Sequence, residues 1–218
     1  MSWVDTNFLS GFRVITGLET TDISDANVYA LGTYALSFVN SQINVRVVRE
    51  KVEYIDSTRE NDVDGSNTTF YVKNWEGNWI GDIPSSPSGL VGTYDITFYE
   101  VDNQGNESTI PISSVNSTQG KIVTSTAPAS DSEAYIDYYY TGIDMDTPDR
   151  RYYSAVIFLT ASMAQARLNI GKAPRVKLGS TDITRDMKAP DYYWNKYLEV
   201  INEINVENNK LHKKYEAI

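Results

Sequence analysis

A chain of 218 residues with 41% hydrophobic and 22% charged residues can bury one large core or two small ones. It has no cysteine, no apolar run near the roughly 20 residues of a membrane span and no basic-then-apolar start, so we expect no disulfide, thiolate metal site, membrane segment or secretory signal. Its formal net charge of −10 is typical of a poor nucleic-acid binder, but suits a surface past which DNA slides without sticking.

The sequence of the N-terminal part predicts an irregular arm followed by a helix. We expect the arm over residues 1–20, interrupted by glycines and anchored by the aromatic residues Trp3, Phe8 and Phe12. A helix is expected to start near Thr21 or Ser24, with apolar residues at steps of three and four: Val28, Leu31, Ala35, Phe38 and Val39. After Ile43 the alternation fits a strand as well as a continued helix.

The segment from Asp56 to about residue 146 differs from the rest of the chain in charge and in the spacing of its apolar residues. This part carries 15 acidic residues against 3 basic ones, and short β-rich runs alternate with turn sequences. Ala134, Ile136 and Tyr138 alternate with more polar residues, which is typical of a half-buried antiparallel strand. We predict strands over Thr68–Lys73, Thr93–Val101, Ser108–Val115, Lys121–Thr124 and Ala134–Thr141.

The clearest helix in the sequence covers Thr147–Gly171. Thr147 is suited to cap it, Pro148 to open it and Gly171 to close it. Its apolar stripe is expected to contain Tyr152, Ala155, Val156, Leu159, Met163, Ala166 and Ile170. None of these residues suggests chemistry, so we expect this helix to be the scaffold of the core.

The C-terminal part is more basic than the rest. Residues 148–218 carry 12 Lys and Arg against 8 Asp and Glu, whereas residues 1–147 carry 7 against 21, which favours an acidic partner for this end. After a basic loop at 172–188, Pro190 is expected to open a helix of about 25 residues. Its seam runs through Trp194, Tyr197, Ile201, Ile204, Asn208, Leu211 and Tyr215. The seam either packs on the chain's own body or docks on a partner or neighbouring copy; a third possibility is fraying after Val206.

Catalytic motifs are mostly absent from the sequence. The sequence has no phosphate-binding loop or dinucleotide fingerprint, and its one histidine, His212, lies in the polar end of the last helix. Asp62, Asp64 and Asn67 faintly resemble a calcium loop, but an ordinary Asp-Gly turn explains them better. We therefore assign no catalytic, cofactor-binding or metal-ligating residue, and we expect no enzyme.

These elements predict an α+β fold. Residues 1–55 and 142–218 form a helical core of two packed helices plus a long C-terminal helix, and residues 56–141 form an inserted, acidic, antiparallel β-domain. The two flanking helices both carry apolar faces that most simply meet each other, which favours an insertion over a tandem domain.

The order of segments resembles the head–tail adaptor (connector, or head completion) proteins of tailed phages and related archaeal tailed viruses. The resemblance covers about residues 14–205 and rests on pattern and order. The segments that carry it are TGLETTDISDA, VDGSNTTFYV, DITFYEVDNQGN, SSVNSTQGKIVTSTAP, AYIDYYYTG and YYSAVIFLTASMAQARLNIG.

The resemblance implies a virion protein made in the host cytoplasm and located in the neck, at the head–tail interface. It forms a ring oligomer beneath the portal, usually a dodecamer, that extends the DNA channel toward the stopper or tail. It implies no catalytic residue and no cofactor; DNA passes without specific binding. The best candidates for contacts with the portal or neighbouring copies are Trp194, Tyr197, Ile201, Ile204, Leu211, Tyr215, Arg175, Lys177 and Arg185. Truncation after Lys188 is expected to leave a folded monomer that no longer docks.

Two rival functions stay open. The first is a virion or cell-surface carbohydrate-binding module that uses Trp75, Trp79 and the tyrosines of residues 135–140 as a stacking platform. The second is a glycosidase that uses a pair of Asp or Glu residues, although the sequence cannot say which two carboxylates pair.

Overall fold

The computed structural model describes residues 6–73, 79–144, 150–170, 175–178, 181–184 and 188–215, and describes side chains over 7–73, 79–144, 150–170 and 188–207. The helices are α1 (Thr6–Thr16), α2 (Asp25–Ile43), α3 (Arg150–Asn169) and α4 (Ala189–Tyr215). The strands are β1 (Val45–Lys51), β2 (Thr69–Tyr71), β3 (Trp79–Ile80), β4 (Thr97–Val101), β5 (Glu107–Ile110), β6 (Ile112–Asn116), β7 (Lys121–Thr124), β8 (Glu133–Thr141), β9 (Arg175–Leu178) and β10 (Thr181–Thr184), with a 3-10 turn η1 (Thr93–Asp95).

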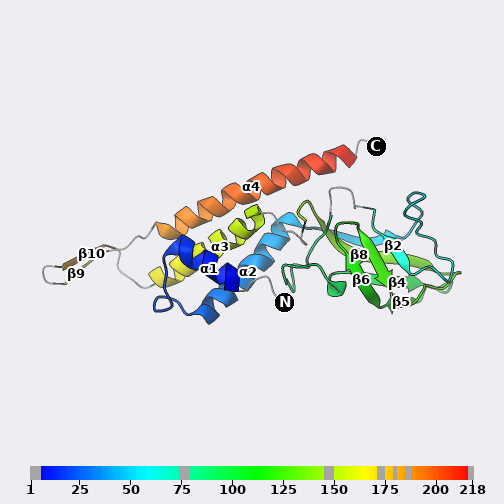
Figure 1. Cartoon of the computed structure of the whole chain (residues 1–218), viewed down its shortest axis with the longest axis horizontal. Coiled ribbons are helices and arrows are strands. Elements are labelled where there is room, and N and C mark those ends of the chain that lie inside the picture. The colour runs from blue at the N-terminus through cyan, green and yellow to red at the C-terminus, as the bar shows by residue number, and fades with distance from the viewer. Residues whose placement is uncertain are drawn as a thin grey trace.

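The predicted α+β fold is confirmed. The four helices gather in one part of an elongated molecule and strands β1 to β8 in the other, while the β9–β10 hairpin lies at the far end of the helical part (Figure 1). The chain leaves the helical part after α2 and returns to it at α3, and α2 packs against α3. Among the described helices, none combines the length and apolar character that crossing a bilayer requires.

The helical core forms around α3, which contacts α1, α2 and α4. Tyr152, Ala155, Val156 and Leu159 are buried as the stripe predicts, but Ile170 is 77% exposed, so the stripe ends before the last turn. The predicted cap residues Thr147 and Pro148 and the closing Gly171 lie outside the described residues. The helix start predicted at Ser24 is confirmed, because its side chain accepts a hydrogen bond from the Asn27 N–H.

The prediction of an irregular arm is wrong for the part of it that is described, because α1 is a regular helix. Phe8 and Phe12, four residues apart, lie on one helix face and are buried in the helical core. Gly11 faces α3: a Cβ there would lie 3.0 Å from the Ile157 Cδ1 atom. The glycine that looked like a breaker therefore allows α1 to approach α3 closely.

The β-domain is a sandwich of two antiparallel sheets. The larger sheet has the order β1-β8-β4-β5, with β3 also paired to β8, and the smaller has the order β2-β7-β6. Phe70 of the smaller sheet meets Phe98 of the larger sheet with ring centroids 4.8 Å apart, at the centre of a separate core. β1 belongs to this domain, so its sheet begins ten residues before the predicted boundary near residue 55.

Residues 108–115 form two strands where the sequence predicted one. Pro111 separates β5 from β6, and it has no N–H for a sheet ladder. β5 pairs with β4 in the larger sheet, whereas β6 pairs with β7 in the smaller one. The chain therefore crosses between the two sheets at this proline.

Candidate partner-binding surface

Three of the residues predicted to form an interface on α4 are instead buried in the helical core of the same chain. Tyr197, Ile201 and Ile204 are 1%, 5% and 2% exposed and belong to the helical core of this chain. Burial also raises the pKa of the Tyr197 phenol to about 12, because the phenolate would be poorly solvated there. Of the alternatives for the seam, packing on the chain's own body is therefore correct for these three residues, and their assignment to a partner interface is wrong.

The other predicted interface residues have different outcomes. Trp194 is 39% exposed, so it offers surface to a partner. Leu211 and Tyr215 lie within α4 and Arg175 and Lys177 within β9, but their side chains are outside the described part. Arg185 lies outside the described residues, and the role of these five residues stays a prediction.

An exposed aromatic surface crosses α2, α3 and α4. Tyr34 is 70% exposed, and Phe38 is 42% exposed. The ring of Phe38 lies 6.2 Å from that of buried Tyr197, and the ring of Trp194 lies 5.2 Å from Tyr197 on α4. We call this the aromatic surface and define it by Tyr34, Phe38, Met163, Trp194 and Leu198.

A groove of about 470 Å³ lies within the aromatic surface. Tyr34, Phe38 and Met163 line it together with two serines of α2, Ser37 and Ser41. The groove is mainly apolar, and its aromatic rings supply large contact area with few rotatable bonds. Neighbouring exposed aromatic side chains of this kind mark sites of protein contact.

Tyr34 was not among the predicted surface residues, and Phe38, which the spacing put in the buried stripe of its helix, is 42% exposed. The buried residues Val28, Ala35 and Val39 form one stripe of α2, whereas Tyr34 and Phe38 form a second stripe four residues apart. When a helix has apolar residues on two faces, packing against its own chain buries one face and leaves the other exposed. This second stripe is the sequence signal that could have located the surface.

The outer face of the larger sheet offers little free aromatic area. Tyr138 and Tyr140 point into the β-domain core, so only Tyr135 and Tyr139 of the predicted platform face outward. The Arg49 guanidinium lies 5.0 Å from the Tyr135 ring and 5.6 Å from the ring of Tyr99. An intramolecular cation therefore covers these rings, which weakens the carbohydrate-platform interpretation.

The structure describes one of the two tryptophans of that platform, and the role of the other stays a prediction. Trp79 is half-buried in β3, where it pairs with Thr141 of β8. Trp75 lies outside the described residues.

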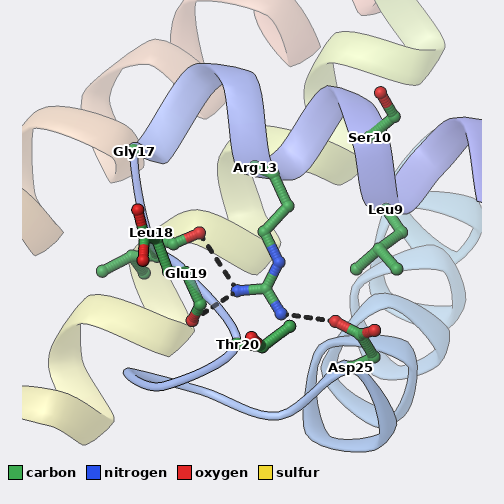
Figure 2. Close-up of a pocket in the computed structure, with 8 residues that line it drawn as sticks. All are labelled: Leu9, Ser10, Arg13, Gly17, Leu18, Glu19, Thr20 and Asp25. Carbon is green, nitrogen blue, oxygen red and sulfur yellow. Dashed lines mark hydrogen bonds and ion pairs between the residues drawn. The ribbon is translucent and has the colours of Figure 1, made fainter.

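A wide pocket of about 710 Å³ near the end of α1 surrounds Arg13 (Figure 2). The guanidinium donates to the carbonyl oxygens of Leu18, Glu19 and Ile23 at 3.1, 2.9 and 2.8 Å. It also pairs with the Asp25 carboxylate at 2.6 Å. These contacts tie the α1–α2 loop to both helices, so Arg13 has a structural role and leaves little capacity for an anionic ligand.

The structure gives no support to metal or acid–base chemistry at the acidic loop. Asp64 accepts hydrogen bonds from the Asn67 and Ser66 N–H groups at 2.7 and 2.8 Å, and these bonds lower the pKa of its carboxyl. It forms the ordinary turn that the sequence favours. In the described part of the chain, no group of three or more His, Cys, Asp or Glu residues is placed to hold a metal ion.

The sequence was compared with protein families and with curated proteins. No protein-family model matches the sequence, and no curated protein is significantly similar to it.

Proposed function

We propose that this chain is a structural virion protein of the head–tail adaptor type. It would form a ring beneath the portal of a tailed phage or an archaeal tailed virus, connect the DNA-filled head to the tail or stopper, and extend the DNA channel. The order of the sequence segments suggests this function, and the exposed aromatic surface on the helical core is the observation that carries it.

The aromatic surface suits contacts that form only in an assembly. Tyr34 and Phe38 protrude from α2 and Trp194 from α4, while the buried Tyr197 holds their helices together. A surface made of a few side chains is too small for a stable pair of isolated proteins. It becomes adequate when many copies bind one multivalent platform together, as in a ring on a portal.

The charge of the β-domain fits a location beside or along a DNA channel. Residues 56–146 carry 15 acidic against 3 basic side chains, so this domain repels the phosphate backbone. The partners in this proposal are the portal protein, neighbouring copies in the ring and the stopper or tail completion protein. DNA passes without specific binding.

The experiment is to mix the purified chain with portal rings of the same virion and to image the mixture by negative stain. The wild-type chain is expected to add a ring of density beneath the portal. The double variant Phe38→Ser, Trp194→Ala is expected to stay folded by circular dichroism and to lose this density, because both exposed rings are removed.

A matched control uses Tyr54→Ala, which removes a 62% exposed tyrosine from the β-domain. It is expected to assemble like the wild type. If the double variant still forms the added ring, the aromatic surface is not the docking site, and if the wild type adds no ring the adaptor function is wrong.

A further inference from the structure

A polar pocket of about 350 Å³ lies on the outer face of the larger sheet. Strands β1, β4 and β8 supply one part of its lining, and the segment 82–95 supplies the rest. The lining residues are Arg46 of β1, Thr97 of β4, Asp137, Tyr138 and Tyr139 of β8, and Ile83, Ser85, Tyr94 and Asp95 of the segment. The volume is at the lower end of the range for small-molecule sites, about 300–1,000 Å³.

The strand register brings the polar lining residues of the sheet next to one another. Arg46 pairs directly with Tyr139 across β1 and β8, and Thr97 pairs directly with Asp137 across β4 and β8. Directly opposite residues share one face of a sheet, and Asp137 and Tyr139, two positions apart on one strand, share that same face. These residues therefore form one contiguous group on the outer face.

Most of the polar side chains of this group are free to meet a ligand. Within the described residues, no hydrogen bond or ion pair engages the side chains of Arg46, Ser85, Thr97 and Tyr139. Asp137 uses its Oδ1 atom to accept hydrogen bonds from the Arg49 N–H at 2.7 Å and the Tyr99 hydroxyl at 3.4 Å, which leaves its Oδ2 atom available. Free polar groups are ordinary on an open surface, but here a guanidinium, a carboxylate oxygen and several hydroxyls converge on one concave site.

The segment that completes the pocket is held in place by two buried carboxyl groups. Asp95 is 3% exposed, and its two oxygens accept from the Ile83 N–H at 2.8 Å and the Gly92 N–H at 2.7 Å. Asp82 is fully buried and accepts from the Gly89 N–H at 2.7 Å. Both oxygens of Asp95 are therefore occupied, so this residue shapes the pocket instead of binding a ligand. A pocket that is formed in advance lowers the entropic cost of binding.

The two outward tyrosines of β8 differ in whether their rings are covered. The Arg49 guanidinium lies 5.0 Å from the Tyr135 ring, which also stacks on Tyr99 with ring centroids 5.8 Å apart. In the part of the chain that the structure describes, no cation or second ring covers Tyr139, which is half-buried at the pocket. Its ring offers an apolar surface to a ligand, and its hydroxyl offers a hydrogen bond.

The charges of the lining favour an uncharged ligand that is rich in hydroxyl groups. Arg46 attracts an anion, but Asp137 and Asp95 belong to the same lining and repel it. A cation meets the opposite conflict, because Arg46 repels it. A neutral polyol satisfies both signs, since its hydroxyls accept from the guanidinium and donate to the free carboxylate oxygen.

We propose that this pocket binds a single sugar residue of a glycan, with Tyr139 against one face of the sugar ring and Arg46, Thr97 and Asp137 hydrogen-bonded to its hydroxyls. The site differs from the broad aromatic platform that the sequence suggested, because it uses one outward tyrosine and neither tryptophan. It belongs to the β-domain and does not depend on whether the chain is an adaptor.

A nuclear magnetic resonance titration of the isotope-labelled full chain tests the site. The probes are the uncharged methyl glycosides of glucose, galactose, mannose and N-acetylglucosamine. We expect at least one of them to bind saturably with a Kd in the millimolar range, and to shift the backbone amide resonances of Arg46, Thr97, Asp137 and Tyr139 but not those of the middle of α3. The proposal is overturned if no probe shifts the pocket residues, or if glycine or inorganic phosphate saturates the pocket more tightly than every sugar.

Tyr139→Ala and Tyr135→Ala make a matched pair, because each removes an outward tyrosine from the same face of β8. Tyr139→Ala is expected to weaken sugar binding about tenfold, whereas Tyr135→Ala should leave the Kd within about twofold of the wild-type value. Thr97→Val removes only a hydroxyl from an exposed position and should weaken binding about threefold.

Equal effects of the two tyrosine variants would place the sugar elsewhere and overturn the assignment. Unchanged binding in both Tyr139→Ala and Thr97→Val would do the same. If Tyr139→Ala does not fold, unchanged binding in Thr97→Val is sufficient to reject the site.

Discussion

The helical core and the β-domain differ in the side chains that they place on their surfaces. The helical core leaves large apolar side chains exposed on α2 and α4, including Tyr34, Phe38 and Trp194. The β-domain also exposes Tyr54 and Tyr94, but its surface carries ion pairs, which are Arg49–Glu107, Lys51–Glu133, Arg59–Asp56 and Lys73–Glu53. Exposed aromatic area favours contact with protein, whereas a charged surface of one dominant sign stays solvated.

This difference suggests different roles for the helical core and the β-domain. The proposed docking surface lies on the helical core, whereas ion pairs stand on the surface of the β-domain. Their two buried cores are separate, although Val91 packs against both. Changes to one region should therefore leave the other largely intact, and four experiments test this.

Truncation after Lys188 should have the largest effect, and it revises the expectation that the shortened chain stays folded. It removes Tyr197, Ile201 and Ile204 from the helical core, where each large apolar side chain contributes about 1.5–3 kcal/mol. That sum is close to the total stability of a typical domain, about 5–15 kcal/mol. We expect loss of most of the helical circular dichroism while the β-domain keeps its exchange protection; retention of a folded helical core would show that α4 is an appendage.

Tyr197→Ala and Trp194→Ala compare two positions of one predicted seam. Tyr197 is 1% exposed and Trp194 39% exposed, so Tyr197→Ala should lower the free energy of unfolding by about 3–5 kcal/mol. Trp194→Ala should cost about 1 kcal/mol or less, because its ring is partly in water already. Urea unfolding measures both, and equal effects would mean that the seam is not divided into core and surface.

The stability of the chain should fall as pH rises from about 4 to about 7. The Asp95 carboxyl ionises at its ordinary pKa of 3.8 in the unfolded chain but at about 7 in the folded one, so the folded state binds more protons between these values. The loss is at most about 4 kcal/mol and should level off above pH 7. Chemical denaturation across this range is the measurement, and in Asp95→Asn this slope should become smaller, leaving the part that comes from the raised pKa values of Asp82 and Glu50.

Arg49→Ala should have the smallest effect. Arg49 pairs with Glu107 on the exposed face of the sheet, where water and salt screen the interaction. We expect a small fall in the unfolding midpoint of the β-domain that shrinks further at high salt, and no change in the helical core. A large fall that salt does not reduce would show that packing on Tyr99 and Tyr135, rather than charge, is what Arg49 provides.

Much of the fold could be predicted from local pattern. Tyr152, Ala155, Val156 and Leu159 lie on one face of any helix that contains them, and they are buried as expected. The alternation at Ala134, Ile136 and Tyr138 likewise predicted strand β8 and its inward face. α1 was missed because Gly11 looks like a breaker, although close packing on Ile157 explains it.

The candidate sites were harder to predict, because what a side chain meets depends on distant segments. Spacing shows that Tyr197 and Ile201 share one face of a helix, but not whether that face meets α3 of the same chain or another protein. The groups that donate hydrogen bonds to the Asp82 carboxylate come from α2 and from residues 88–89, as far as 42 positions away in sequence. No local pattern distinguishes this aspartate from a turn residue.

The sequence by itself determined the fold class, the position of the β-rich insertion and the apolar stripes of the main helices, because these depend on periodicity over a few residues. Only the tertiary structure decided that α4 completes the core, that Tyr34, Phe38 and Trp194 remain exposed, and that Asp82 and Asp95 are buried. The physical reason is that burial depends on which residues are neighbours in space, and tertiary packing determines those neighbours.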